Sequence, residues 1–137
     1  MPHRFARAVS SPRPHLCFGL LACLTLAACS NGPKDKLRGK WIGDRIENVS
    51  ADDAARAMGW VKGAMWEFAG DKLTVSIPAE SPRTGTFKVA KAEAEKLVLS
   101  VTRPDGQTDE TVLRLSEGKT IHWDIGQNRE IVLVRAE

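Results

Sequence analysis

The stretch "KLVLSVTRPDGQTDETVLRLS", residues 96–116, contains two runs of alternating apolar and polar side chains on either side of a turn. In the first run, Leu97, Leu99 and Val101 fall on one face of an extended chain, because successive side chains of a β-strand point to opposite faces. The "RPDGQ" between the runs supplies Pro, Asp and Gly for a tight reversal. The stretch therefore predicts an antiparallel β-hairpin.

Similar runs extend from this hairpin toward both ends of the chain. The turn signals between them are "AGDK" at 69–72, "PAESPRTG" at 78–85, "SEGK" at 116–119 and "GQN" at 126–128. Turns spaced about 8 to 12 residues apart are typical of an antiparallel sandwich or barrel. We expect an all-β, up-and-down meander of about seven or eight strands that closes into a small barrel, since closure removes exposed edges.

The first strand is predicted at residues 39–47, "GKWIGDRIE", with Ile42 and Ile46 in phase and Trp41 on the other side. One short helix should follow it, within "SADDAARAM" at residues 50–58. Ser50 is suited to the N-cap, and the two aspartates that follow favour the first turn of a helix.

Side chains that fall in phase along the strands form the predicted core. They are Trp66, Phe68, Leu73, Val75, Ile77, Phe87, Val89, Leu97, Leu99, Val101, Leu113, Leu115, Ile121, Trp123, Ile125, Ile131 and Leu133. A ligand cavity normally includes a few placed polar groups, so this apolar set favours a packed interior over a cavity. If a ligand does bind, it should be apolar and should enter beside the helix, where Trp60, Met65 and Trp66 are the candidate ligand-mouth residues.

The first thirty residues have a different character. They carry three arginines and no acidic residue, then an apolar run of eleven residues from Leu16 to Leu26, then small residues. That order is typical of a secretory signal peptide. The run is too short for a transmembrane helix, which takes about 20 residues.

The end of this segment, Leu26, Ala27, Ala28 and Cys29, resembles the lipobox of bacterial lipoproteins. The resemblance implies that residues 1–28 are removed, that the Cys29 sulfur receives a diacylglycerol, and that the protein is held on a membrane by its lipid anchor. Ser30, in place of an aspartate, resembles the sorting signal for the outer membrane. We expect a periplasm-facing protein of the bacterial cell envelope.

Removing 28 of the 137 residues would leave 109, made of the lipidated cysteine with a tether at 29–36 and one barrel domain at 37–137. The leader carries three of the twenty Lys and Arg and none of the seventeen Asp and Glu, so the remainder has seventeen of each. This balance excludes a broad basic surface for nucleic acid. Cys17 and Cys23 leave with the leader, so no disulfide is expected.

The "GKW" at residues 39–41 resembles the glycine–any residue–tryptophan signature of lipocalins and other calycins. In that family the tryptophan packs at the closed end of the barrel under an arginine from the final strand. The resemblance therefore implies a barrel-closing pair of Trp41 and Arg135. A guanidinium over an indole face contributes about 0.5 to 2 kcal/mol.

Catalytic and metal-binding patterns find little support. In "HWD", His122 and Asp124 share a strand face, and Ser100 or Ser116 would be the nucleophile of a triad, but no elbow motif accompanies them. The acidic residues Asp44, Glu47, Asp52 and Asp53 could attract calcium loosely, although the last two are explained by the helix start. We expect that the protein is not an enzyme and that it binds no metal ion and no cofactor.

Two functions follow from these patterns. In the first, the barrel of an anchored lipoprotein binds a small apolar molecule or an envelope component. In the alternative, the packed barrel is a protein-interaction module, such as an assembly factor, a sensor or a protease inhibitor. A filled interior would favour the alternative.

Overall fold

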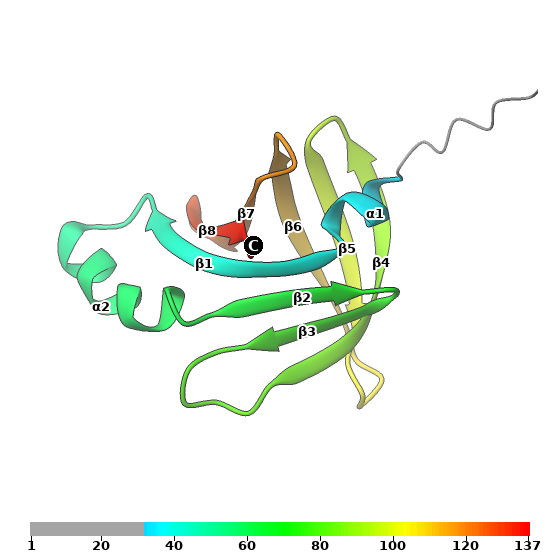
Figure 1. Ribbon diagram of the computed structural model, residues 1–137, viewed down its shortest axis with the longest axis horizontal. Coiled ribbons are helices and arrows are strands. Elements are labelled where there is room, and N and C mark those ends of the chain that lie inside the picture. The colour runs from blue at the N-terminus through cyan, green and yellow to red at the C-terminus, as the bar shows by residue number, and fades with distance from the viewer. Residues whose placement is uncertain (1–31) are drawn as a thin grey trace, which may run out of the picture.

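The computed structural model describes residues 32–137, and these form a closed antiparallel barrel (Figure 1). Its strands are β1 Gly39–Glu47, β2 Met65–Ala69, β3 Lys72–Ser76, β4 Arg83–Glu93, β5 Lys96–Thr102, β6 Thr108–Ser116, β7 Thr120–Gly126 and β8 Arg129–Arg135. Each strand pairs with the next one in the chain, and β8 closes the barrel against β1. The predicted all-β, up-and-down barrel is confirmed, with eight strands.

The hairpin predicted at residues 96–116 forms as expected. Leu97 lies opposite Leu113 and Leu99 opposite Thr111, with the turn at the predicted position. The segment 90–96, "AKAEAEK", is mostly strand, because β4 continues to Glu93 and β5 begins at Lys96.

A β-bulge in β1 changes the expected phase of that strand. The register shifts between Gly43 and Arg45, so the alternation of inward and outward side chains is reset there. As a result Ile46 packs against the core, whereas the Ile42 side chain is 39% exposed. The prediction that Ile42 and Ile46 share a face is wrong for this reason.

The predicted helix is α2, Ala51–Val61, and it follows the first strand. The Ser50 hydroxyl accepts a hydrogen bond from the Asp53 backbone N–H at 3.1 Å, as expected of an N-cap. The helix runs past Gly59, where an end was expected. Val61 and Ala57, one turn apart, are buried in the core, and this packing outweighs the cost of a helical glycine.

A second helix, α1, covers Pro33–Leu37 and was not predicted. It overlaps the tether expected at residues 29–36. Pro33 begins it, and Leu37 is completely buried at its end. Figure 1 shows α1 beside β4, at the end of the barrel away from α2.

Fifteen buried apolar side chains make up the core: Leu37, Trp41, Ala57, Val61, Trp66, Phe68, Leu73, Phe87, Leu97, Leu99, Leu113, Leu115, Ile121, Ile131 and Leu133. Five further predicted residues, Val75, Val89, Val101, Trp123 and Ile125, are half-buried against it. Ile77 does not join the core, because β3 ends at Ser76. The two helices supply the buried residues that strand alternation could not reveal.

Candidate functional site

Aromatic side chains pack against one another and against aliphatic residues in the barrel interior. The ring centroids of Trp66 and Trp123 lie 4.3 Å apart, and those of Phe68 and Phe87 lie 5.2 Å apart in an edge-to-face arrangement. Within residues 32–137 the buried set contains no polar or charged residue. The inner face does carry one polar pair, in which Trp123 Nε1 donates to Thr111 Oγ1 at 2.8 Å, so the polar groups by which a pocket orients a ligand are few.

The three candidate ligand-mouth residues do not line one opening. Trp66 points inward and is only 3% exposed, while Met65, the preceding residue, lies on the outer face opposite Ile42. Trp60 is on α2 and is 36% exposed. The helix closes its end of the barrel with Val61 instead, since a Cβ added to Gly43 would lie 1.8 Å from the Val61 carbonyl oxygen.

At the opposite end, Arg135 lies over the indole of Trp41, with the guanidinium carbon 4.2 Å from the ring centroid. Its Nη1 donates to the Arg38 carbonyl at 2.7 Å and its Nη2 to the Lys36 carbonyl at 2.9 Å. Trp41 Nε1 donates to the Leu37 carbonyl at 2.8 Å. The pair thus fastens α1 across the base of the barrel.

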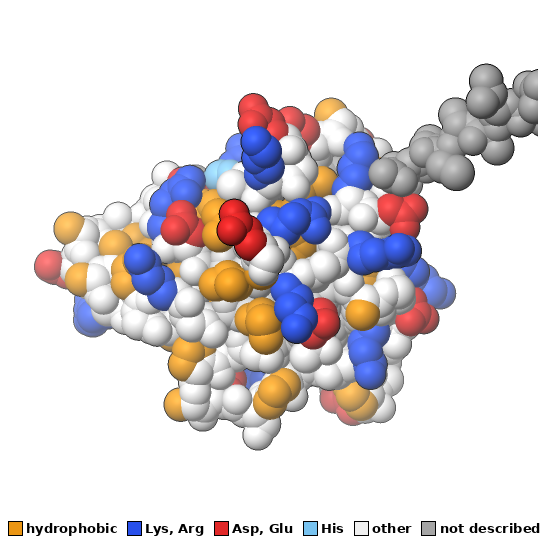
Figure 2. All heavy atoms as spheres, in the orientation of Figure 1, with side chains coloured by type: hydrophobic (Ala, Val, Ile, Leu, Met, Phe, Trp, Pro, Cys, Tyr) orange, Lys and Arg blue, Asp and Glu red, His pale blue; other side chains and the backbone are white. Residues whose placement is uncertain are grey.

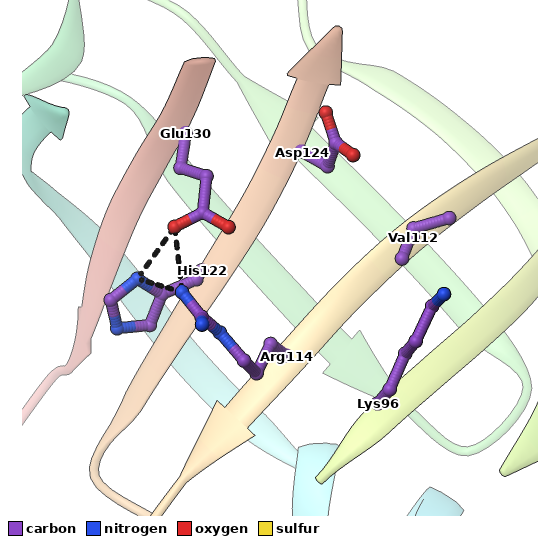
Figure 3. A pocket seen from close by; sticks show the side chains of 6 residues that line it. All are labelled: Lys96, Val112, Arg114, His122, Asp124 and Glu130. Atoms are coloured by element: carbon purple, nitrogen blue, oxygen red, sulfur yellow. Dashed lines mark hydrogen bonds and ion pairs between the residues drawn. The ribbon is translucent and has the colours of Figure 1, made fainter. Parts of the chain in front are cut away.

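The most concentrated group of chemically active side chains lies outside the barrel, where β1, β8, β7 and β6 run side by side. We call Glu47, Arg114, His122 and Glu130 the His122 cluster. Arg114 is the cross-strand partner of His122, and Glu47 is that of Glu130. Figure 3 shows the arginine, the imidazole and Glu130 converging.

Short contacts join the members of the His122 cluster. Oε2 of Glu130 lies 3.1 Å from Nδ1 of His122 and 2.7 Å from Nη2 of Arg114. Oε2 of Glu47 lies 3.7 Å from the same Nδ1. The His122 side chain is only 15% exposed, so the contacts of its imidazole are partly shielded from water and are stronger than on an open surface.

An open pocket of about 220 Å³ adjoins the cluster; its lining residues are Lys96, Val112, Arg114, His122, Asp124 and Glu130 (Figure 3). It is formed by the outward side chains of β5 to β8, and it does not lead into the core. A small polar molecule or ion is the kind of ligand that this mixed lining suits.

The residues considered for a catalytic triad are not brought together. Asp124 shares the outer face with His122, but its Oδ1 accepts from the Gly126 backbone N–H at 2.7 Å. It is Glu130 that contacts the imidazole. In the described part of the chain no hydrogen bond joins Ser100 or Ser116 to His122.

The four acidic residues considered for calcium also separate. Asp44 and Glu47 both pair with Arg45, at 2.8 Å each. The hydrogen bonds that Arg45 donates to Asp44 and then to Glu47 raise the pKa of its guanidinium above the ordinary value, so Arg45 remains a cation. Asp52 and Asp53 lie in the first turn of α2.

Sequence reasoning singled out His122 and Glu47 but missed Glu130 and Arg114. Glu130 and Arg114 each lie eight residues from His122 in the chain, and only the strand register places them beside it. The strand register that follows from the predicted turns at 116–119 and 126–128 would have placed both residues beside His122. Cys29 and the leader lie outside the described residues.

Comparisons with protein-family models, with curated proteins and with solved structures find no match to this chain. The small closed barrel of eight antiparallel strands is compatible with a lipocalin-like fold. Neither helix in residues 32–137 has the length and apolar character needed to span a bilayer.

Proposed function

We propose that the protein is a lipid-anchored lipoprotein of the bacterial envelope whose packed barrel binds an envelope protein through its outer surface. The observation that supports this most is the filled interior, in which Trp66, Phe68 and Trp123 occupy the space that a carrier would leave for a ligand. The proposal includes no catalytic step and no cofactor.

The outer face of the barrel offers an apolar strip for such a partner. Val134, Ile42 and Met65 are cross-strand neighbours on β8, β1 and β2, and all three side chains point outward. Ile42 is exposed, and Val134 and Met65 are half-buried. Figure 2 shows hydrophobic side chains over this part of the surface, among charges of both signs.

The proposed anchor fixes how the barrel is presented. Cys29 lies three residues before Gly32, a span of about 10 Å when fully extended. A lipid on Cys29 would hold α1 and the base of the barrel near the headgroups. The α2 end would then face away from the membrane.

Replacing Cys29 by serine should release the protein from the membrane, since a lipobox transferase attaches the diacylglycerol to a cysteine sulfur and serine has none. We expect the wild-type protein in the detergent-soluble membrane fraction, with the mass of a cleaved and lipidated chain. C29S should be absent from that fraction and should carry no lipid. Cys23→Ser is the matched control and should behave as wild type. An unmodified thiol at Cys29 in membrane-extracted protein would contradict the anchor.

A photoreactive benzoylphenylalanine at position 42 tests the binding surface. Irradiated cells should give one discrete crosslinked protein from this position, since it lies at the centre of the apolar strip. The same residue at Glu110, an exposed position on β6, should give none. Equal products from both positions would contradict the proposed surface, and a saturable change in tryptophan fluorescence with a fatty acid would contradict the packed interior.

A further inference from the structure

We propose that Glu47, His122 and Glu130 form a binding site for a zinc ion on the outer face of the barrel. The three residues come from β1, β7 and β8, and one ligand atom from each lies within 4.8 Å of the other two. This site is separate from the apolar strip, and the inference does not depend on the proposed partner.

The separations of His122 from the two carboxylates are close to what zinc requires. Nδ1 of His122 lies 3.1 Å from Oε2 of Glu130 and 3.7 Å from Oε2 of Glu47. Tetrahedral zinc with bonds of about 2.1 Å separates neighbouring ligand atoms by about 3.4 Å. The two separations from His122 would change by a few tenths of an ångström, whereas the Glu47 and Glu130 oxygens, which lie within 4.8 Å of one another, would have to approach by up to about 1.4 Å.

The strand register supplies an independent reason for a cation here. Glu130 lies directly between Glu47 on β1 and Asp124 on β7, so three carboxylates occupy one cross-strand row. Like charges in direct cross-strand positions destabilise a sheet. In this structure Arg45 offsets the charge of Glu47 and Arg114 that of Glu130, and a divalent ion between the two carboxylates would take over the role of Arg114.

The donor set favours zinc over calcium or magnesium. One imidazole nitrogen with two carboxylate oxygens is a zinc set, whereas calcium and magnesium prefer oxygen ligands alone. His122 would bind as the neutral tautomer that carries its proton on Nε2. Arg45 holds Oε1 of Glu47 at 2.8 Å, and this contact orients the carboxylate with Oε2 toward the imidazole.

Arg114 is the competitor of the ion in this arrangement. Its Nη2 lies 2.7 Å from the Glu130 oxygen and 3.3 Å from Nδ1 of His122, so it occupies part of the space that zinc would take. The Arg114 side chain is half exposed and borders the open pocket, so it has room to move aside. The pocket also leaves the fourth coordination position accessible to a water molecule or a small anion.

Calorimetric titration with zinc chloride tests the site on the full protein, extracted in detergent and free of a histidine tag. We expect one wild-type site that His122→Ala weakens at least about tenfold and Glu47→Gln by a similar factor. Glu110→Gln is the matched control, since it removes a carboxylate from an exposed position on the outer face of β6, and its affinity should equal that of wild type.

Arg114→Gln separates a zinc site from a merely structural ion-pair network. Removal of the competing guanidinium should tighten zinc binding several-fold, although it removes an ion pair from the folded protein. Circular dichroism would establish that each variant is folded. Equal zinc affinity of wild type and both ligand variants, weaker binding by Arg114→Gln, or no binding by wild type would overturn the proposal.

Discussion

Trp41→Ala is expected to lower the free energy of unfolding by about 3–5 kcal/mol, the range found when a buried tryptophan or phenylalanine is truncated. Trp41 is completely buried, donates to the Leu37 carbonyl and lies under Arg135. Its loss would leave a cavity at the base of the barrel and would free α1. Urea denaturation followed by far-UV circular dichroism measures the change.

Trp60 provides the matched comparison, because it is a tryptophan whose side chain is partly exposed on α2. Trp60→Ala should cost about 1 kcal/mol or less. Trp41→Phe, which keeps an aromatic ring but no N–H donor, should fall between the two. Equal losses for Trp41→Ala and Trp60→Ala would show that the base is not held by this contact.

Gly43→Ala is expected to destabilise the protein by about 3 kcal/mol, at the upper end of the cost of overpacking. The new methyl group would lie 1.8 Å from the carbonyl oxygen of Val61, and backbone atoms cannot turn away as a side chain can. The hydrogen bond from Gly43 N–H to the Ala64 carbonyl, 2.9 Å, would be strained as well. Denaturant titration should show the loss, and hydrogen exchange should show weaker protection of α2.

Gly59→Ala is the control for Gly43→Ala, and it lies in α2, the helix that Gly43 contacts. A Cβ at Gly59 meets no atom within 4 Å, and alanine is the better helix former. This variant should be more stable than wild type by about 0.5–1 kcal/mol. A loss of stability in both glycine variants would mean that the helix, rather than its close approach to Gly43, is sensitive to substitution.

Most of the barrel could be predicted because its core strands have one wet and one buried face. Leu97, Leu99 and Leu113 needed only the period of two to be placed. The bulge in β1 has a sequence signal in Gly43, because an isolated glycine inside a strand often marks a bulge, but the glycine alone does not give the phase of the residues after it. Helix α1 is too short to show a helical period, and it depends on tertiary contacts.

The His122 cluster illustrates why sites on a sheet are harder to predict than the sheet. The sequence places Asp124 two residues from His122 on the same face, which suggests a pair. In the structure, neighbours across the strands are closer than neighbours along one strand, so Glu130 and Arg114 reach the imidazole. Knowledge of the register is needed before such a group can be recognised.

The contacts of Arg135 with the Lys36 and Arg38 carbonyls join positions that are 99 and 97 residues apart. In a growing chain, the Lys36 and Arg38 carbonyls can gain these hydrogen bonds only after almost a hundred further residues have been made. Until then Trp41 and Leu37 remain available to chaperones and to proteases. The hydrogen bonds that span the longest stretch of chain are thus close to the proposed lipid, and a chain that ends before Arg135 would lack them.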